Sequence, residues 1–276
     1  MPGGARVEVA ALVRDVADRY AGLPSTRGVA LAGSSASGLA SRDSDIDLYI
    51  YANPEISVAD RARIARVGAS RSEIDNRFFE PGDEWVDAAT GVTVDVMFRD
   101  PSWIEEQLDR VLVRHVASVG YSTCFWHNIR SSEPLFDRHG WLAALKRRAE
   151  LPYPEELRRA VVAKNHPILR DHLSSFLHQL ERAVVRSDLV SVNHRVAALL
   201  ASWFDVLFAL NREPHPGEKR LAEIAEARCP LRPADLARRV SDLVSAAGVS
   251  GSEVVIRASH LVDALDELLR AEGLLF

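Results

Sequence analysis

Hydrophobic and polar residues follow the periods of helices and strands along the first hundred residues. Over 7–20 the apolar residues recur at helical spacing, which predicts a helix that ends before Gly22. A short apolar run at 28–32 leads into a segment of Gly and Ser residues. Residues 46–51 alternate as a strand does, and 92–98 form a run rich in β-branched residues. This region is therefore expected to contain both helices and strands.

Two pairs of residues mark the starts of further helices. Ser57 and Asp60 have the spacing of a capping box, which predicts a helix that begins at Ser57. Asp100 followed by Pro101 predicts another, because proline is favoured at the first helical position. A weaker strand pattern covers 72–80. The resulting order of elements predicts a small mixed β-sheet with flanking helices.

The strand pattern disappears after about residue 150. Helical patterns cover 155–185, 189–211, 218–228, 233–247 and 252–272. Segments rich in Pro and Gly separate several of these patterns. We therefore predict an α+β protein with two domains. The sheet domain occupies 1–150, and an all-α helical bundle domain occupies 151–276.

Composition limits the class of protein. Of the 276 residues, 47% are hydrophobic and 26% are charged, as in soluble globular proteins. No apolar stretch is long enough for a membrane span, and the N-terminus does not resemble a secretory signal. We therefore expect no membrane partner and a cytoplasmic location. Only two cysteines, Cys124 and Cys229, are present, which argues against a disulfide framework.

The charge balance disfavours a nucleic-acid partner. The chain has 34 basic and 39 acidic residues and a net charge of −5. Proteins that grip nucleic acid along its backbone usually carry a basic excess. A local basic groove stays open, but a long nucleic-acid track is not expected.

Two aspartates stand in the strand predicted around residue 46. Asp45 and Asp47 are two residues apart, so both carboxylates project from one face of the strand. Two adjacent carboxylates repel each other unless a cation or a proton lies between them. Such a pair suits hard divalent cations, and phosphoryl chemistry commonly uses two of them about 4 Å apart.

A third acid, Asp95, interrupts the apolar strand predicted at 92–98. A charge in such a strand is unfavourable unless it is paired or binds a metal. If this strand lies beside the one that carries Asp45 and Asp47, the three carboxylates converge.

The segment before these aspartates suits phosphate binding. Gly33 allows a tight turn in which the backbone approaches a ligand closely. The N–H groups around Gly33 and the Ser34 hydroxyl are candidates to hold the β- and γ-phosphates. Ten residues, 35–44, separate Ser34 from Asp45, and the Gly-Lys-Ser/Thr ending of a P-loop is absent.

These residues together resemble the DNA polymerase β-like nucleotidyltransferase superfamily. Its motif is an apolar residue, Gly and then Gly or Ser, a spacer of about ten residues, and Asp-apolar-Asp/Glu-apolar. This motif matches Ala32-Gly33-Ser34 and Asp45-Ile46-Asp47-Leu48, with Asp95 as the later acid. The resemblance covers roughly 25–100, and it is looser over 150–276. The two-domain layout looks like bacterial enzymes that adenylylate aminoglycosides and lincosamides, and like uncharacterised relatives.

The resemblance implies a reaction and a set of residues. A nucleoside monophosphate, with ATP as the favoured donor, would be transferred to a hydroxyl of a small molecule, and pyrophosphate would be released. Asp45, Asp47 and Asp95 would be the catalytic and metal-binding residues for two Mg²⁺ ions, with Asp95 helping to deprotonate the acceptor. The nucleotide-binding group implied by the family is Gly33, Ser34, Ser44 and Lys219.

Lys219 belongs to this group because 210–219 resembles a helix–loop element that faces the nucleotide in the family. The helical domain would then close the cleft that holds nucleotide and acceptor. Family members often carry a basic residue after the position of Ser34, but this chain has Ser35-Ala36-Ser37 there. A lysine ammonium suits a triphosphate as a point charge, so Lys219 is a candidate to supply the missing charge.

Simpler interpretations stand beside each of these. Asp45 and Asp47 fit a solvated strand end, Asp95 fits a pair with an arginine, and Lys219 fits an ordinary exposed lysine. We expect an acidic turn at 80–84 rather than a site for a cationic acceptor, and Trp85 as a packing residue at the edge of the site.

The function also has alternatives. The fold can serve a non-catalytic nucleotide-binding or interaction protein, or a transferase that acts on a protein or an RNA. The sequence also allows a homodimer.

Overall fold

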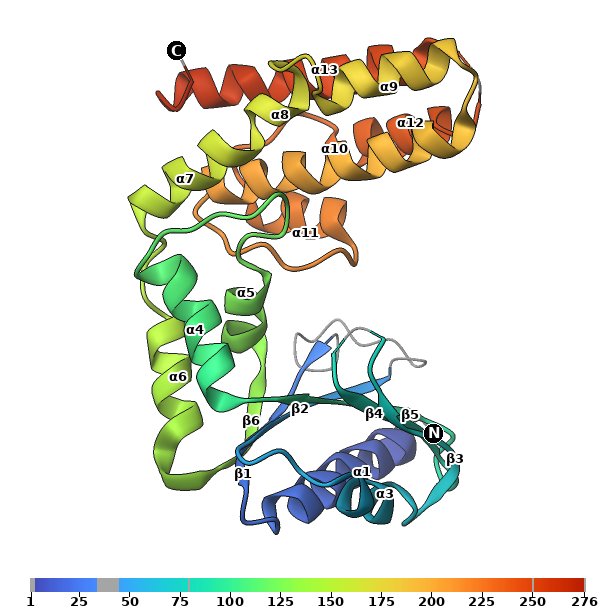
Figure 1. Cartoon of the computed structure of the whole chain (residues 1–276), viewed down its shortest axis with the longest axis vertical. Helices are drawn as coiled ribbons and strands as arrows, with labels where there is room; N and C mark the ends of the chain where they lie inside the picture. The colour runs from blue at the N-terminus through green and yellow to red at the C-terminus, as the bar shows by residue number, and fades with distance from the viewer. Residues whose placement is uncertain (1–2, 34–44, 79, 250, 276) are drawn as a thin grey trace. The chain divides into compact units, whose positions relative to one another are not determined.

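The computed structural model describes residues 3–33, 45–78, 80–249 and 251–275 (Figure 1). The chain forms two compact units. Unit 1 comprises Met1–Leu108 and Asn128–Leu151, and unit 2 comprises Asp109–His127 and Pro152–Phe276. Residues 109–127 thus belong to the same unit as the C-terminal half of the chain.

The elements up to residue 151 are a mixture of strands and helices, as expected. In chain order they are α1 (Gly3–Ala21), β1 (Thr26–Leu31), β2 (Ile46–Ala52), α3 (Val58–Ala65), β3 (Ala69–Asn76), β4 (Gly82–Asp87), β5 (Thr93–Arg99), α4 (Pro101–Leu112), α5 (Cys124–Ser131), β6 (Glu133–Asp137), the short 3₁₀ helix η1 (Arg138–Gly140) and α6 (Trp141–Ala149).

In the described part of the chain these strands form one six-stranded sheet of order β3-β4-β5-β2-β1-β6. Strands β2 and β5 are parallel, and every other neighbouring pair is antiparallel. The sheet is therefore mixed. Together with the helical C-terminal region described below, it confirms the predicted α+β fold.

One face of this sheet carries the core of unit 1. Helices α1 and α3 lie against this face (Figure 1), and their apolar residues join the buried residues of β1, β2, β4 and β5. Ile46, Leu48 and Ile50 of β2 belong to this cluster. Because side chains alternate along a strand, Asp47 and Tyr49 project from the opposite face.

The predicted helix start at Ser57 is confirmed. The Ser57 hydroxyl caps α3 by accepting a hydrogen bond of 3.1 Å from the backbone N–H of Asp60. Such a bond satisfies one of the N–H groups that have no partner inside the helix.

Strand β4 is not the acidic turn that the sequence suggested. Charged residues are uncommon in strands, so Asp83 and Glu84 favoured a turn. In the structure both lie in β4, and Trp85 is 3% exposed in the core of unit 1 rather than at the edge of a site. Strand β6 was also missed, because its short sequence contains a proline.

The charge of Asp83 is tolerated because Arg61 of α3 meets it inside the protein. Arg61 Nε donates to Asp83 Oδ2 at 3.0 Å, and Arg61 Nη2 donates to Asp83 Oδ1 at 2.5 Å. The arginine side chain is fully buried, and its guanidinium lies 4.2 Å from the ring centroid of Phe98. This two-bond pair fixes α3 against β4.

This ion pair gives the first testable prediction. Asp83→Leu removes the buried partner of Arg61 and leaves this charge with its longer contacts to Asp75 and Glu55, at 3.4 and 3.7 Å. The change should lower the free energy of unfolding by about 3 kcal/mol, the lower end of the range for a broken buried pair. The double variant Arg61→Met/Asp83→Leu removes both charges and should recover most of that loss. Urea unfolding followed by circular dichroism measures the free energy of unfolding of the single and the double variant. A double variant as unstable as Asp83→Leu would contradict this account.

Unit 2 is mainly helical, as predicted. Its helices after residue 151 are α7 (Glu155–Asn165), α8 (Pro167–Arg170), α9 (Phe176–Val185), α10 (Leu189–Leu210), α11 (Leu221–Arg228), α12 (Leu236–Ala246) and α13 (Glu253–Ala271). The single helix expected over 155–185 is wrong, because a new helix starts at Pro167, which has no N–H to continue α7. Among the described residues, no helix is both long and apolar enough to cross a membrane.

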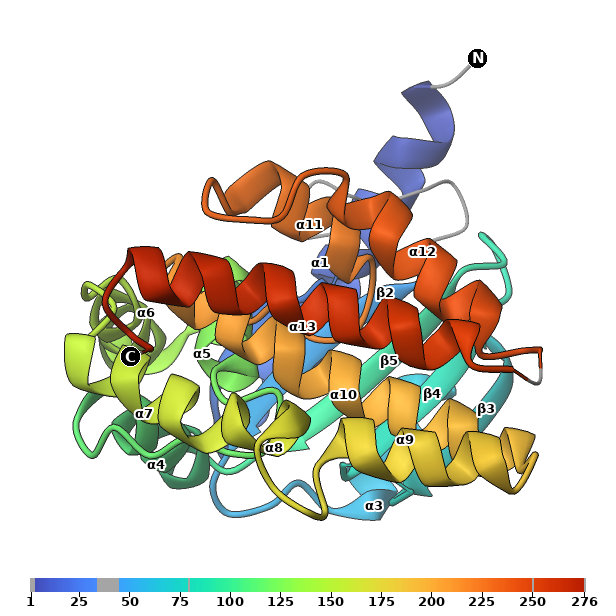
Figure 2. The same cartoon turned by 90° about the horizontal axis from the view of Figure 1, so that it is seen from above.

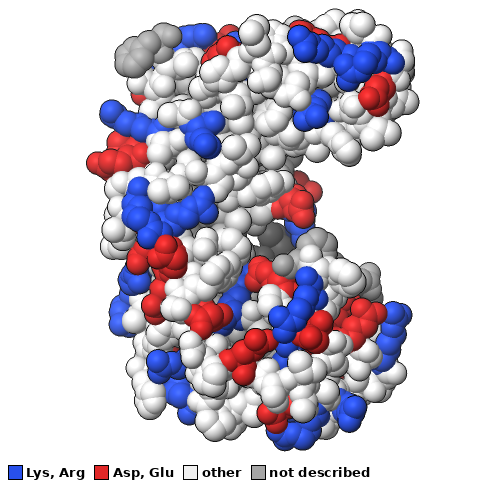
Figure 3. Space-filling view, in the orientation of Figure 1, with Lys and Arg blue, Asp and Glu red and all other residues white. Residues whose placement is uncertain are grey.

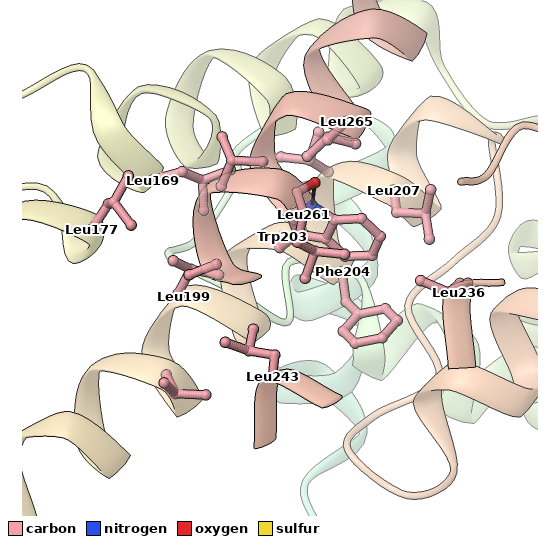
Figure 4. Close-up of a cluster of buried hydrophobic side chains, with 14 of the residues drawn as sticks. Leu169, Leu177, Leu199, Trp203, Phe204, Leu207, Leu236, Leu243, Leu261 and Leu265 are labelled. Atoms are coloured by element: carbon pink, nitrogen blue, oxygen red, sulfur yellow. Dashed lines mark hydrogen bonds between the residues drawn. The ribbon is translucent and has the colours of Figure 1, made fainter. Parts of the chain in front are cut away.

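The core of unit 2 surrounds α10, whose second half is almost entirely buried. Figure 4 shows Trp203 and Phe204 of α10 among leucines of α12 and α13. The indole N–H of Trp203 donates to the backbone carbonyl of Leu261 at 3.0 Å. Helix α10 is thus held by both apolar packing and a buried hydrogen bond to α13.

A buried carboxylate ties the segment 118–123 to these helices. Asp205 of α10 accepts hydrogen bonds from the Ser122 N–H at 3.0 Å, the Ser122 hydroxyl at 2.6 Å and the Asn165 amide at 3.1 Å. Asn165 also accepts from the Gly120 N–H at 2.8 Å. Burial raises the pKa of Asp205 to about 6. These bonds explain why 109–127 belongs to unit 2.

His215 is a second buried titratable group of unit 2. Its ring lies edge-on to Tyr121 and Phe208, with centroid distances of 4.9 and 5.1 Å. The side chain is fully buried, and burial lowers its pKa from 6.5 to about 3, with a smaller contribution from His127. The folded protein therefore holds this imidazole in its neutral form.

We expect His215 to make unit 2 less stable in acid. As pH falls below 6.5, the unfolded chain binds a proton on His215, and the folded chain does so only near pH 3. This residue therefore lowers stability by about 1.4 kcal/mol per pH unit within that window. Asp205 acts in the opposite sense between pH 6 and 3.8, because its raised pKa lets the folded chain bind the proton first.

Comparison with His215→Phe separates the two groups, since the variant keeps Asp205. Its free energy of unfolding relative to the natural chain should rise steadily from pH 6.5 to pH 4.5. Urea unfolding at half-unit pH steps measures this difference. A difference that does not change with pH would show that His215 does not titrate in this way.

Candidate active site

The parallel pairing of β2 and β5 places two of the three candidate acids side by side. Asp47 is the register partner of Asp95, and adjacent strands lie about 4.8 Å apart. Both residues are half-buried, and they lie on the sheet face opposite to Ile46 and Leu48. Asp45 is exposed and immediately precedes β2.

The backbone of Gly33 lies directly against the Asp47 carboxylate. Gly33 has a φ of +64°, and a Cβ added to it would lie 1.7 Å from Asp47 Oδ2. The N–H of Ala32 donates to the Asp47 carbonyl at 2.8 Å, which extends the pairing of β1 with β2 up to the glycine. Only glycine allows this close approach between the chain and a carboxylate.

Further carboxylates continue the row across the same face of the sheet. Glu84 of β4 is the register partner of Asp95, and Glu73 of β3 is the partner of Glu84. Figure 2 shows the four strands β2, β5, β4 and β3 lying in this order. Like charges directly opposite each other destabilise a sheet. Arg71, on the same face of β3, meets Glu73 at 3.0 Å, so a basic side chain already balances the outermost of these acids.

A buried arginine lies farther along the same face. Side chains alternate along β5, so Arg99 shares the face of Asp95. Its guanidinium lies 3.8 Å from the ring centroid of Tyr49 and donates to Glu80 at 2.7 and 3.0 Å. The pKa of Tyr49 is raised, chiefly by burial; Arg99 opposes this rise and the Asp47 charge adds to it.

The sequence pattern did not single out Tyr49 or Arg99. The signal for both was an even spacing along strands that already carried candidate acids, since Tyr49 lies two residues after Asp47 and Arg99 lies four residues after Asp95. Glu80, which it assigned to an acidic turn, is instead the partner of Arg99.

The carboxylate oxygens of Asp47 and Asp95 are suited to bind Mg²⁺. This ion is usually held by one or two carboxylates together with waters and substrate phosphates, rather than by a full set of protein ligands. Asp47 and Asp95 supply such a pair. Among the described residues, no group of three or more His, Cys, Asp or Glu side chains is arranged to hold a metal ion. Convergence of Asp45 with the other two acids stays a prediction.

The other candidate residues are placed as follows. Ser34 and Ser44 lie outside the described residues. Lys219 is exposed in unit 2, in the loop before α11. Lys146, another of the few lysines, instead donates to the backbone carbonyls of Ile129 and Arg130 at the end of α5, at 3.1 and 3.0 Å. This role is structural, because a cation stabilises the C-terminus of a helix.

Two family models match parts of the chain. Residues 11–118 match the family described as Nucleotidyltransferase domain, and residues 127–221 match the family described as Domain of unknown function (DUF4037). The first match contains Gly33, Asp45, Asp47 and Asp95. A search of curated proteins finds none that matches the chain.

Two solved structures are similar to the chain at low sequence identity. A nucleotidyltransferase-like protein from Exiguobacterium sibiricum 255-15 is 14% identical, with a TM-score of 0.45 over 96% of this chain and 76% of that chain. The CCA-adding enzyme of Thermotoga maritima, solved in complex with tRNA, is 12% identical, with a TM-score of 0.34 over 97% of this chain and 82% of that chain.

The contact between Gly33 and Asp47 predicts a matched pair of variants. Gly33→Ala should displace the Asp47 carboxylate and abolish Mg²⁺-dependent nucleotide binding. Gly91→Ala is the control, because Gly91 has a similar φ of +71° but a Cβ there meets no atom within 4 Å. Both variants bear the left-handed strain of about 1–2 kcal/mol. Isothermal titration calorimetry should therefore separate them, and equal binding by both would refute the proposed role of this contact.

Proposed function

Because residues 11–118 carry a nucleotidyltransferase domain, we propose that the chain transfers a nucleoside monophosphate, with ATP as donor, to a hydroxyl of a small-molecule acceptor. Catalysis is assigned to 1–150, and 151–276 is the accompanying helical domain. The placement of Asp47 beside Asp95, with the Gly33 backbone against Asp47, is the observation that carries this proposal.

In this proposal the acids hold the metal and the glycine segment holds the phosphates. Asp45, Asp47 and Asp95 bind two Mg²⁺ ions, which supply charge stabilisation to the transferring phosphoryl group when bound. The backbone N–H groups after Ala32, with Ser34 and Ser44, bind the triphosphate, and Lys219 adds a positive charge. The core on the opposite sheet face keeps β2 and β5 rigid, so the carboxylates stay in register.

The reaction balances without a further reactant. The acceptor hydroxyl oxygen forms a bond to the α-phosphorus, and the bond between that phosphorus and the oxygen that bridges to the β-phosphate breaks. Asp95 accepts the hydroxyl proton, and the electron pair of the broken bond leaves with pyrophosphate. The protein contributes mainly by holding the reacting atoms in line.

The distribution of charge supports a small acceptor over a nucleic acid. On the face shown in Figure 3, basic and acidic side chains of the described residues lie in small separate groups that do not join into one continuous basic surface. Backbone binding to a nucleic acid depends on clustered Lys and Arg. Glu84 of β4, the register partner of Asp95, is instead suited to an acceptor that carries positive charge.

Metal-dependent nucleotide binding is the direct test. With ATP and Mg²⁺ at about 100 times the dissociation constant, the natural chain should be stabilised by roughly 2.7 kcal/mol, seen as a rise in melting temperature. ATP should give the largest rise among the four nucleoside triphosphates. Asp45→Asn and Asp47→Asn should show no rise in melting temperature with ATP and Mg²⁺. The natural chain should show no rise with ATP when Mg²⁺ is left out.

Glu73→Gln is the matched control, because it removes a carboxylate from the same sheet face, three strands away from Asp47. Glu73→Gln should show the same rise in melting temperature with ATP and Mg²⁺ as the natural chain. No rise with any nucleotide in the natural chain would refute the proposal. Binding without pyrophosphate release in a screen of hydroxyl acceptors would favour the non-catalytic alternative.

A further inference from the structure

The two edges of the sheet in unit 1 are built differently. Strand β6 at one edge has five residues, and it contains Pro134, which has no N–H to offer to a further strand. Strand β3 at the other edge has eight residues and no proline, and Figure 2 shows it as the outermost strand. In the described part of the chain, no strand pairs with the outer side of β3. Its outward backbone N–H and C=O groups are therefore a template for another strand.

The side chains in the middle of β3 are charged and exposed. Arg71 and Glu73 have side-chain exposed fractions of 78% and 53%, and Arg71 Nη2 donates to Glu73 Oε1 at 3.0 Å. Charged side chains on an edge strand usually prevent its pairing with foreign strands. These two charges are opposite in sign and stand on either side of Ser72. The pattern therefore repels most strands but is complementary to a second copy of itself.

A two-fold axis can pair β3 with β3 of a second copy in the antiparallel direction, because each copy then presents the same surface. Residues opposite each other in an antiparallel pair have the same hydrogen-bonding role, and this role alternates along a strand. A residue, rather than a peptide bond, therefore lies on the axis. With Ser72 on the axis, Arg71 lies opposite Glu73 of the second copy, and Glu73 lies opposite Arg71 of the second copy.

The charges favour this register over its two neighbours. With Arg71 on the axis, the Arg71 side chains of both copies would lie opposite each other, and with Glu73 on the axis the Glu73 side chains would do so. Like charges directly opposite each other destabilise a pair of strands, whereas opposite charges stabilise it. Of these three registers, only the one centred on Ser72 sets both charges of each copy against opposite charges.

Exposed apolar residues stand beyond both ends of β3. Phe78 comes two residues after the strand and is 85% exposed, and Val67 comes two residues before it and is 57% exposed. An antiparallel pair brings the end of one strand to the start of the other. The segment that carries Phe78 would thus come near the segment that carries Val67 of the second copy. Exposed aromatic residues are enriched at protein interfaces, which agrees with this arrangement.

We propose that β3 is a self-association edge, at which two copies of the chain pair antiparallel about Ser72 and join their sheets. Such an axis is perpendicular to the sheet, so the faces that carry Asp47 and Asp95 in both copies lie on the same side of the joined sheet. The pairing of β3 with β4 is regular only over Arg71–Glu73. The contact is therefore short, and the dimer is weak and depends on concentration. This inference uses residues of unit 1 alone and does not rest on the proposed function.

Exchange of the two charges tests this inference. Arg71→Glu sets Glu opposite Glu73 at two positions, and Glu73→Arg sets Arg opposite Arg71 at two positions. Each variant should raise the dissociation constant of the dimer by about tenfold or more, because two like-charge pairs replace two ion pairs. Arg71→Glu/Glu73→Arg restores opposite charges at both positions and should dimerise like the natural chain. Sedimentation velocity over a range of protein concentrations measures the dissociation constant.

A control variant and a second measurement locate the contact. Arg27→Glu makes the same change of charge on an exposed arginine of β1, four strands away from β3, and should dimerise like the natural chain. Amide hydrogen exchange in 70–74 of the natural chain should slow as protein concentration rises, and Arg71→Glu should not show this slowing. Because Arg71 and Glu73 are exposed, their variants should keep the melting temperature of the natural chain, as measured by circular dichroism.

The outcomes that would overturn the inference are distinct. A natural chain that stays monomeric up to about 1 mM would show that the charges of β3 only protect the edge. A dimer that Arg71→Glu leaves intact would place the interface elsewhere. A double variant that dimerises as weakly as the single variants would exclude the register centred on Ser72. None of these measurements involves a nucleotide, so failure of the inference and failure of the proposed function are read separately.

Discussion

The parallel pairing of β2 with β5 is the constraint on which the site depends. It sets Asp47 opposite Asp95 and directs Leu48 and Val96 into the core on the other side. Because side chains alternate along a strand, a shift of β5 by one residue relative to β2 would turn Asp95 toward the core and the apolar residues of β5 away from it. The energy of the apolar core therefore fixes the register that brings two mutually repelling carboxylates together.

Charge within unit 1 is divided between the two faces of the sheet. On the helix-covered face, Arg61 neutralises Asp83, which lets a charged residue lie inside the core. On the other face, Glu80 holds Arg99 against Tyr49, while Asp47 and Asp95 face each other across neighbouring strands. Bound metal and phosphate are thus expected to balance the acids in the proposed function.

In unit 2, buried polar groups hold loop segments in place by hydrogen bonds. Apolar packing alone would not fix the conformation of these segments. Asp205 holds Ser122 across 83 residues of sequence, and Thr123 next to it accepts the N–H of His215. Each buried group fixes a loop or connection, because an unsatisfied polar group in a core is costly. The helices themselves need only the leucine-rich core around Trp203.

The sequence by itself determined most of the elements and the proximity of Asp45 to Asp47, because local periodicity encodes which residues share a face. It did not determine β4 or the kink at Pro167, since Asp83 becomes compatible with a strand only when Arg61 meets it. Only the tertiary structure decided that Asp47 faces Asp95 and that His215 is buried. Those outcomes depend on contacts between residues far apart in the chain, and no local pattern contains them.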